Sequence, residues 1–513
     1  MLVNSNKRLG INLIATLMSF LITAGINFFL TPYVVRHLGA AAYGFVTLAT
    51  NVISYTQILT IALNSLAGRF VTISYTKGDI RSANKYFSSV FYSNLILSSI
   101  VITILTVCIY WLEFIFEIPS QLVFDVKLLF VFLTLNTILG LLISVFRVAT
   151  FVKNRLELSS LRDIISNLIR GLGLFLLFYF FPPHIWFIGF IGTIVTIYLG
   201  YANYKFTITL TPELSVNLKN FDKNKVFELI KAGMWNSLYK IGDMFGQGLD
   251  ILLANVFIGA TAMGVFAITR QIPILIIGTS AMISNAFNPM LTQLFALNKI
   301  DDLKNEVNKA IRIQGSIVII PLTFLIVFGS DLFALWLPTQ DKSLLQTLSV
   351  IFCLELGFSL PYDALWNIFQ VTNKIKWSTL FFLFKNIITF AILYIVLHLF
   401  DDSYSKLLVL AGTRSVIGIV SALTFSPLYG AKCLKVPFRS FYPAQGRFLV
   451  CLILTLVLAS LLRYILPVHS WLLLIMSLVF STIICMTISF LLLLKKHERA
   501  YFMERVGKVF VKR

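Results

Sequence analysis

Apolar runs of about 20 residues recur along the whole chain, and short polar stretches separate them. A helix needs about 20 apolar residues to cross the hydrocarbon core of a bilayer. The pattern therefore predicts an all-α polytopic membrane protein with about fourteen transmembrane helices. The predicted spans lie at residues 9–34, 43–70, 86–111, 123–149, 159–181, 184–204, 230–257, 262–290, 313–337, 344–370, 376–399, 406–428, 447–466 and 470–494.

The composition agrees with this assignment, because 58% of the residues are hydrophobic and only 12% are charged. Soluble domains carry about twice that share of charged residues. The polar stretches between spans are too short to form a domain outside the membrane. The sequence has no Ser-His-Asp arrangement, no phosphate-binding glycine loop and no metal-ligand spacing, and its five cysteines show no paired spacing. We therefore predict no catalytic residues, no metal and no disulfide.

Basic residues are distributed unevenly between the two sides of the predicted membrane protein. With the N-terminus inside, the inner loops and tails, with Arg162 and Arg312 among them, hold 29 Lys and Arg, and the outer loops hold 5. Basic residues accumulate in cytoplasmic loops, so both termini are expected in the cytoplasm and the number of spans is expected to be even. The net charge of +20 then reflects topology and a rim that faces anionic lipid, and we expect no nucleic-acid partner.

The segment 231–259 is long enough to span a bilayer, and it nevertheless carries a polar stripe. The stripe consists of Asn236, Lys240, Asp243, Gln247 and Asp250. Spacings of three and four residues place these side chains on one helix face, within a wedge of about 80°. Charges at this depth are costly unless they face a water-filled cavity or partners, so we predict that the helix lines a cavity. Lys240 and Asp243 are expected to pair, which leaves Asp250 as a candidate Na⁺ or H⁺ site.

Two segments that lie 220 residues apart share a sequence pattern. LGAAAYGFVTLA at 38–49 is similar to IGATAMGVFAIT at 258–269, and each precedes or begins a predicted span. The shared glycines are Gly39 with Gly259 and Gly44 with Gly264. They permit a tight turn and a close approach between helices. The polar segments at 77–87 and 298–312 also correspond, and both are predicted to form short amphipathic helices on the inner surface.

These correspondences predict two six-helix copies with the same orientation in the membrane, around a central cavity, followed by two additional helices. The predicted domains are an N-terminal lobe at 1–210, a C-terminal lobe at 226–430, the two additional helices at 440–494 and a basic tail at 495–513. The first span of the first copy carries an uncharged polar stripe formed by Asn12, Thr16, Ser19, Thr23 and Asn27. Only the second copy therefore brings charge to this helix face.

The segments 32–49, 76–87 and 258–273, together with the fourteen-span layout, carry a resemblance to a known family. The sequence resembles the polysaccharide (O-antigen) flippases of the MOP (multidrug/oligosaccharidyl-lipid/polysaccharide) exporter superfamily. These flippases are relatives of the multidrug/toxin extrusion transporters and of the lipid II flippase. The resemblance covers the whole chain in architecture.

The resemblance implies a flippase in the bacterial inner (cytoplasmic) membrane. Its cargo would be undecaprenyl-diphosphate-linked oligosaccharide for surface polysaccharide such as lipopolysaccharide O-antigen, moved to the periplasmic leaflet by alternating access. Besides the cargo and the lipid bilayer, the expected partner is the polysaccharide polymerase machinery. We expect no cofactor, and we expect transport to be coupled to Na⁺ or H⁺.

A pyrophosphate group needs cations inside the membrane, and the planar guanidinium of arginine suits it well. The candidate substrate-binding cations are Arg270, Arg414, Arg147, Arg69, Lys385 and Arg170. The alternative for each is a snorkelling or ion-paired structural residue, and for Arg170 helix packing in the sequence RGLG competes. We favour Arg270 and Arg414, which lie deeper and come from the second copy.

Two further acids, Glu355 and Asp363, lie in one predicted span with Pro361 between them. They form a second candidate ion-coupling site, and the alternative is ion pairing beside a proline kink. Trp235 and Tyr239 flank the stripe at 231–259 and are candidates for stacking on a sugar.

Two other functions compete with the flippase. A cation-coupled drug exporter of the same superfamily would usually have twelve spans and an acidic cavity. Here the cations at membrane depth outnumber the acids, which favours an anionic cargo. A membrane glycosyltransferase, polymerase or ligase of the same pathway would carry a large outer loop with catalytic residues, and the predicted outer loops are short.

Overall fold

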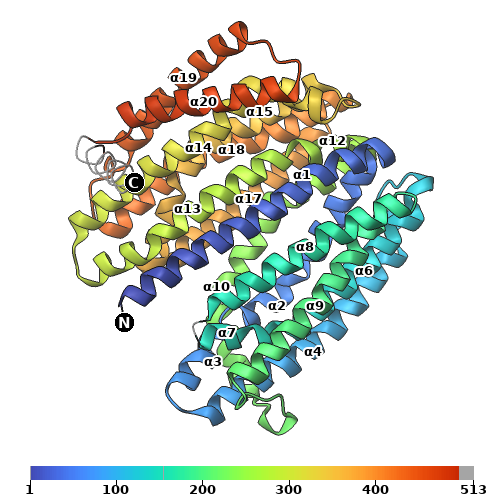
Figure 1. Cartoon of the computed structure of the whole chain (residues 1–513), viewed down its shortest axis with the longest axis vertical. Helices are drawn as coiled ribbons and strands as arrows, with labels where there is room; N and C mark the ends of the chain where they lie inside the picture. The colour runs from blue at the N-terminus through green and yellow to red at the C-terminus, as the bar shows by residue number, and fades with distance from the viewer. Residues whose placement is uncertain (1, 154, 496–498, 500–513) are drawn as a thin grey trace, which may run out of the picture. The chain divides into compact units, whose positions relative to one another are not determined.

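The computed structural model describes residues 2–153, 155–495 and 499, with side chains from Met18 onward except at 156, 247 and 289. These residues form α-helices and short 3-10 helices, with no strand among them (Figure 1). The first part of the chain forms α1 (Leu2–Tyr55), α2 (Gln57–Asn64), α3 (Ala67–Thr76), α4 (Ile80–Tyr110), α5 (Leu112–Ile115), η1 (Ser120–Leu122), α6 (Val123–Ile143), η2 (Ser144–Arg147), α7 (Val148–Val152), α8 (Leu156–Phe180), α9 (Trp186–Leu210), η3 (Leu218–Asn220), α10 (Lys223–Gln247), α11 (Leu249–Ile258) and α12 (Ala260–Thr269). The second part forms α13 (Gln271–Ala296), α14 (Ile300–Trp336), α15 (Lys342–Ser359), η4 (Leu360–Tyr362), α16 (Asp363–Val371), α17 (Ile375–Leu397), α18 (Ser403–Leu434), α19 (Tyr442–Ile465) and α20 (Trp471–Leu492).

The predicted number of spans is confirmed, because 14 helices of the described chain are long and apolar enough to cross a membrane. The protein is therefore an all-α, multi-pass membrane protein. Span 10 is interrupted by η4 (Leu360–Tyr362), a 3-10 turn that contains Pro361. The helix is thus interrupted at Pro361, and proline is a known cause of such interruptions. Span 4 is interrupted in the same way by η2, although it contains no proline there.

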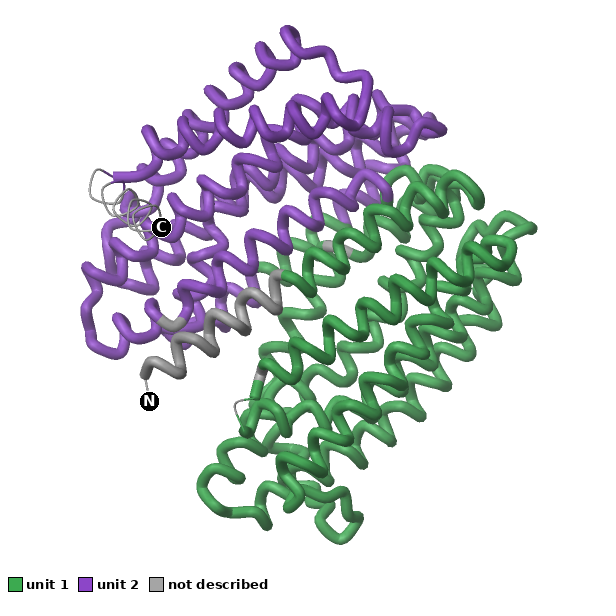
Figure 2. Tube along the Cα trace, viewed as in Figure 1, with its two compact units in different colours: residues 1–267, 382–390 green, residues 268–381, 391–513 purple. Residues whose placement is uncertain are grey.

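The chain folds into two compact units (Figure 2). Unit 1 comprises residues 1–267 and 382–390, and unit 2 comprises residues 268–381 and 391–513. Helices α10 and α11 and most of α12 belong to unit 1, because α10 packs along α2 and α4. The observed units thus have other bounds than the predicted lobes, and the two lobes with a central cavity stay a prediction. The predicted tail at 495–513 lies outside the described residues except for 495 and 499.

The predicted repeat is visible in the backbone at two pairs of turns. Gly39 interrupts α1 with φ 86° and ψ 166°, and Gly259 separates α11 from α12 with φ 120° and ψ 171°. At the other end of the next helix, Gly78 has φ 80° and Asn298 has φ 56°. A positive φ favours glycine and is tolerated by asparagine, so the same turn chemistry occurs twice at the same spacing of 220 residues.

The two repeated segments also touch each other inside unit 1. A Cβ atom added to Gly44 would lie 2.9 Å from the Cα of Gly264, and one added to Gly264 would lie 2.0 Å from the carbonyl oxygen of Ala40. Only glycine leaves room for this backbone contact between α1 and α12. The close helix approach that was predicted for these glycines is therefore confirmed.

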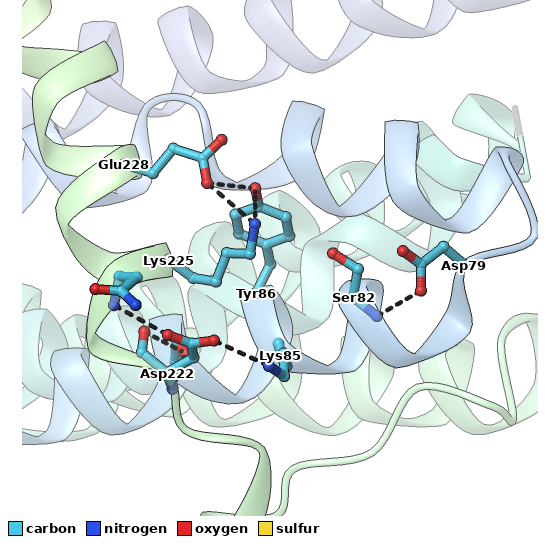
Figure 3. Close-up of polar contacts among 9 residues, drawn as sticks. Asp79, Ser82, Lys85, Tyr86, Asp222, Lys225 and Glu228 are labelled. Carbon is cyan, nitrogen blue, oxygen red and sulfur yellow. Dashed lines mark hydrogen bonds and ion pairs between the residues drawn. The ribbon is translucent and has the colours of Figure 1, made fainter.

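The prediction of short amphipathic helices at 77–87 and 298–312 is wrong. Both segments are the first turns of long helices, since α4 runs without a break from Ile80 to Tyr110 and α14 runs from Ile300 to Trp336. The sequence of α4 contains no Gly or Pro, so nothing ends the helix between its polar first turns and its apolar body. Asp79 caps α4, because its side chain accepts a hydrogen bond from the Ser82 amide at 2.9 Å (Figure 3).

The linker at 211–222, between the two sequence copies, lies against the first turns of α4. The Asn84 amide donates to the Glu213 carbonyl and accepts from the Ser215 amide, both at 2.8 Å. The buried hydroxyls of Ser88 and Ser89 each bind linker backbone groups in the same way. Side chains of α4 therefore satisfy the linker backbone and fix its path within unit 1.

Ion pairs continue this contact into the first turns of α10 (Figure 3). Lys85 on α4 binds Asp222 at 3.0 Å, and Tyr86 donates a hydrogen bond to Glu228 at 2.7 Å, while Lys225 donates to the Tyr86 hydroxyl at 3.0 Å. The hydrogen bond from Lys85 is the main reason why the pKa of Asp222 lies below its usual value. The start of the second sequence copy is thus held on a helix of the first.

Candidate functional site

The polar stripe of the 231–259 segment lies on α10 and α11 in unit 1. Lys240 Nζ lies 2.8 Å from Asp243 Oδ2, which confirms the predicted pairing. Asp250 is buried, with 3% of its surface exposed, and Asn236 is half-buried. The side chain of Gln247 lies outside the described residues. The stripe is therefore formed by an internal ion pair and a separate buried carboxylate.

The middle of α17 lies against this stripe. Asn386 donates a hydrogen bond to the Gly242 carbonyl at 2.8 Å, and a Cβ atom at Gly246 would lie 2.8 Å from the Asn386 side chain. The glycines of α10 therefore allow α17 to approach closely. The sequence analysis missed Asn386, because nothing in a single sequence pairs two helices that lie 144 residues apart.

Aromatic and cationic side chains meet at the same contact. The rings of Tyr239 and Phe382 stack with centroids 5.1 Å apart and an angle of 17°. Lys385 lies over the Phe382 ring, 5.1 Å from its centroid. The structure thus brings together Tyr239, the pair of Lys240 with Asp243, and Lys385, all of which the sequence had singled out. The rings of Tyr239 and Phe382 and the ammonium group of Lys385 are the kinds of group that bind a sugar phosphate.

The uncharged stripe of α1 is used for packing within unit 1. Thr23 donates to Asn167 of α8 at 3.2 Å, and Arg170 of α8 donates to Asn27 at 3.4 Å. The side chains of Asn12 and Thr16 lie outside the described residues. This geometry favours the helix-packing alternative for Arg170, because its neighbour Gly171 also lies close to Ile26 of α1.

Arg69 and Arg147 lie on neighbouring elements of unit 1, α3 and η2, and both side chains are exposed. Close to Arg147, the structure buries Arg162 on α8, with 7% of its surface exposed. Arg162 donates hydrogen bonds to Asn203 and Asp163. The assignment of Arg162 to an inner loop was wrong, because α8 already begins at Leu156. Arg312 was misplaced in the same way, since it lies buried within α14.

The two favoured arginines lie in unit 2. Arg270 stands at the start of α13 with 8% of its surface exposed, and its guanidinium lies 5.9 Å from the centre of the Phe352 ring. Glu355, one turn after Phe352 on α15, lies against Gly418 of α18, where an added Cβ would be 2.2 Å from Glu355 Oε1. Arg414 lies one turn before Gly418. Arg270 therefore lies at α15, and Arg414 lies on α18, the helix that packs against α15.

Glu355 and Asp363 are not brought together, because η4 separates them and each faces a different helix. Glu355 lies against α18, whereas Asp363 accepts a hydrogen bond from Ser280 of α13 at 2.9 Å. Gln314 of α14 donates to the same Ser280 hydroxyl at 2.6 Å. A joint site of the two acids is therefore not formed, and Asp363 belongs to a polar network of its own.

Within the part of the chain that the structure describes, no three His, Cys, Asp or Glu side chains lie close enough to hold a metal ion. The polar groups in the spans are instead cations, single carboxylates, amides and hydroxyls. Such groups can bind a charged or sugar-bearing cargo and a single monovalent cation.

Comparison with known proteins identifies the family. Residues 9–295, more than half of the chain, match the model of the family described as "Polysaccharide biosynthesis protein". The chain belongs to this family. A relative with 27% identity over 501 residues, which covers 97% of this chain and 98% of the relative, is described as "Uncharacterized membrane protein EpsK" of Bacillus subtilis (strain 168). "Probable flippase AglR" of Haloferax volcanii is 21% identical over 378 residues, which covers 70% of this chain and 72% of the relative.

Solved membrane-protein structures share the fold of this polysaccharide biosynthesis protein. It is similar to "Lipid II flippase MurJ, inward closed conformation" with a TM-score of 0.65 and 16% identity, over 93% of this chain and 98% of that chain. It is also similar to the inward-facing conformation of a multidrug resistance MATE family transporter of the MOP superfamily, with a TM-score of 0.66 and 14% identity over 81% and 94% of the two chains. The predicted family and fold are confirmed, because the family model matches and the solved structures share the fold.

Proposed function

We propose that the protein translocates undecaprenyl-diphosphate-linked oligosaccharide units across the bacterial inner membrane, by alternating access, for surface polysaccharide biosynthesis such as that of lipopolysaccharide O-antigen. The observation that carries the proposal is the match to the polysaccharide biosynthesis protein family, on a chain with 14 candidate spans. The likeness to a lipid II flippase supports a lipid-linked cargo, because it extends over 93% of the chain. In this proposal both termini lie in the cytoplasm, and the polymerase machinery receives the cargo.

The geometry of the charged side chains supports an anionic cargo. Arg270 is buried in unit 2, and its planar guanidinium can bind a pyrophosphate with two parallel hydrogen bonds. Arg414 lies on α18, which packs against α15, and is the second proposed ligand of the pyrophosphate. In unit 1, the stacked rings of Tyr239 and Phe382 beside Lys385 suit the glycan.

A second candidate function is export of drugs or other small molecules. One observation favours it, namely the TM-score of 0.66 against a multidrug resistance transporter. A cation-binding exporter would use the carboxylates Asp250 and Glu355, whereas the proposed flippase uses the arginines. Removal of the basic side chains should therefore abolish transport if the protein is a flippase and leave transport intact if it is an exporter.

The test is complementation of a flippase-null bacterial strain, scored by surface polysaccharide and by the amount of membrane-inserted protein. Arg270→Ala and Arg414→Ala are each expected to lower cargo transfer about 100-fold at an unchanged protein level, because truncating one partner of a buried charge pair costs about 2–5 kcal/mol. Arg439→Ala is the matched control, since Arg439 is exposed outside the candidate spans. Full complementation by both cavity variants would contradict the proposed role of the arginines.

Complementation also separates the two candidate functions. If the wild-type chain fails to restore polysaccharide but lowers drug sensitivity, the exporter replaces the flippase. Mass spectrometry of the lipid-linked intermediates then shows whether any such lipid accumulates on the cytoplasmic side.

A further inference from the structure

Helix α19, the first of the two additional helices, borders an open cavity in unit 2. It packs along α14, and the two helices touch where the buried hydroxyls of Thr323 and Thr455 share a hydrogen bond of 3.0 Å. Beyond this contact, towards the C-terminal ends of both helices, lies a cavity of about 500 Å³, which we call the α14–α19 cavity. It is lined by Ile326, Val327, Leu456, Ser460, Arg463 and Tyr464. Its volume falls in the range of cavities that bind small molecules.

Arg463 bridges the two helices beside this cavity. Its Nη1 atom donates to the Val327 carbonyl at 2.8 Å and its Nη2 atom to Asp331 Oδ1 at 3.1 Å, while Nε lies 2.8 Å from Asp331 Oδ2. A guanidinium has more N–H donors than these contacts use, so donors remain for a ligand. The Arg463 side chain is 40% exposed, and it can therefore present these donors to a molecule in the cavity.

Polar and apolar groups are separated along the α14–α19 cavity. Arg463 and Tyr464 lie in the last turn of α19, and Ser460 lies one turn earlier. Leu456 and Ile326 lie next to the contact between the two threonines, deeper in the candidate spans. A membrane lipid has the same arrangement, with its phosphate at the surface of the bilayer and its acyl chains in the hydrocarbon core.

The cavity opens on a face of α19 that the protein leaves uncovered. Tyr464 is 89% exposed, and Ser460 is exposed as well. On the same helix, Ile453 and Val457 are exposed apolar residues within a candidate span. The surroundings of such a face are lipid, so the molecule that has access to the cavity is a lipid.

The charges at the cavity suit a ligand with a single negative charge. Among the described residues that line it, only Arg463 is charged, and Asp331 behind it balances part of that charge. A phosphodiester, as in a glycerophospholipid, has one negative charge and accepts hydrogen bonds from a guanidinium and from hydroxyls. A lipid diphosphate has a higher charge, for which this cavity offers no further described cation.

We propose that the α14–α19 cavity binds one glycerophospholipid of the membrane. Arg463, Ser460 and Tyr464 bind its phosphodiester, and one acyl chain lies along Ile326 and Leu456. The bound lipid fills the space between α14 and α19 and so fastens the additional helices to the rest of unit 2. In the orientation proposed above, this end of the helices faces the outer leaflet. The lipid is distinct from the transported cargo, and the site does not depend on the proposed function.

The test uses the purified full chain in detergent micelles. Bound lipid is counted by native mass spectrometry while phosphatidylglycerol, or in a second series phosphatidylethanolamine, is added, and the melting temperature is measured in the same samples. Both lipids contain the phosphodiester, and the two series show which headgroup binds more tightly. The wild-type chain is expected to retain one phospholipid and to melt at a higher temperature as the lipid concentration rises.

Two variants separate the cavity from the ion pair. Ser460→Trp fills the cavity and leaves Arg463 and Asp331 in place, and it is expected to weaken phospholipid binding at least about 10-fold. Arg463→Gln removes the cation and should weaken binding about 10-fold as well. Val457→Trp is the matched control, because it adds the same side chain to an exposed position of the same helix that does not line the cavity. It should bind phospholipid as the wild type does.

Three outcomes would overturn the proposal. The first is that Ser460→Trp and Arg463→Gln retain phospholipid as tightly as the wild type, or that the wild type retains none. The second is a dimer of the wild-type chain that Ser460→Trp abolishes, since the cavity would then belong to an interface between two copies. The third is displacement of the bound phospholipid by an equal concentration of undecaprenyl diphosphate, which would assign the cavity to the cargo. Loss of complementation by a chain that still binds the phospholipid would contradict only the proposed flippase.

Discussion

The two sequence copies share a framework and differ in the chemistry that the framework carries. The turn glycines Gly39 and Gly259 and the positive φ of Gly78 and Asn298 recur at one spacing. The charged groups do not recur, because the stripe of the first copy binds α8 through uncharged side chains, apart from Arg170 on α8 itself. The comparison shows that duplicated packing positions can be kept while the polar stripe of the first helix carries charge in only one copy.

The largest loss of stability is expected from a substitution at the contact between α1 and α12. Gly264→Ala places a Cβ atom 2.0 Å from the Ala40 carbonyl oxygen, so α1 and α12 have to separate. Overpacking of this kind costs about 3 kcal/mol. The melting temperature of the purified protein is expected to fall by several degrees, with a smaller fall for Gly44→Ala.

Gly25→Ala is the control for this prediction, because no atom lies within 4 Å of the added Cβ. It exchanges glycine for the better helix former and should leave the melting temperature unchanged or raise it. Equal behaviour of Gly25→Ala and Gly264→Ala would show that the repeated segments do not need their close contact.

Local sequence signals were sufficient for the framework. The fourteen spans, the turns at Gly39 and Gly259, and the kink at Pro361 depend on apolar run length and on the conformational range of single residues. The same local signals failed at helix ends. Arg162 looked like a loop residue because it is basic and close to the end of an apolar run, whereas Asn203 from another helix buries it.

The site could be predicted only as a set of residue types. The sequence singled out Lys240, Asp243 and Lys385, but the approach of α17 to Gly242 depends on tertiary packing. It paired Glu355 with Asp363 because they are close in sequence, and the structure separates them by a 3-10 turn. Partners of buried polar groups come from distant helices, and a single sequence contains no signal for such pairs.

A second comparison concerns two buried polar networks. The network of Asn94 in the first copy is neutral, and the network of Gln314 and Ser280 in the second copy includes the carboxyl group of Asp363. Asn94→Leu removes the partner of Asn64, Ser144 and the Leu141 carbonyl at once. Leaving buried polar groups unsatisfied costs about 1–3 kcal/mol each, so a destabilisation of roughly 2–3 kcal/mol is expected. Gln314→Leu should cost about 1 kcal/mol, because Ser280 keeps its bond to Asp363.

The two leucine variants are compared by urea unfolding in mixed micelles. Asn94→Leu should lower the stability more than Gln314→Leu does, because it leaves more buried polar groups without a partner. An equal loss of stability in the two variants would contradict this difference between the copies.

The smallest change in stability is expected at the N-termini of α4 and α14, where the two copies differ in helix capping. Asp79 caps α4 with φ −83° and ψ 74°, and Lys299 stands at the corresponding position of α14 with φ −85° and ψ 70° but makes no side-chain cap bond. Asp79→Ala should cost about 1 kcal/mol. Lys299→Asn should stabilise by about 0.5 kcal/mol, since the backbone already has the capping conformation and asparagine adds no charge beside Asp301 and Asp302.

Thermal unfolding of the two variants and of the double variant measures both effects, and these should add because the positions are independent. A loss of stability in Lys299→Asn would show that the second copy depends on the lysine for a contact that the cap cannot replace.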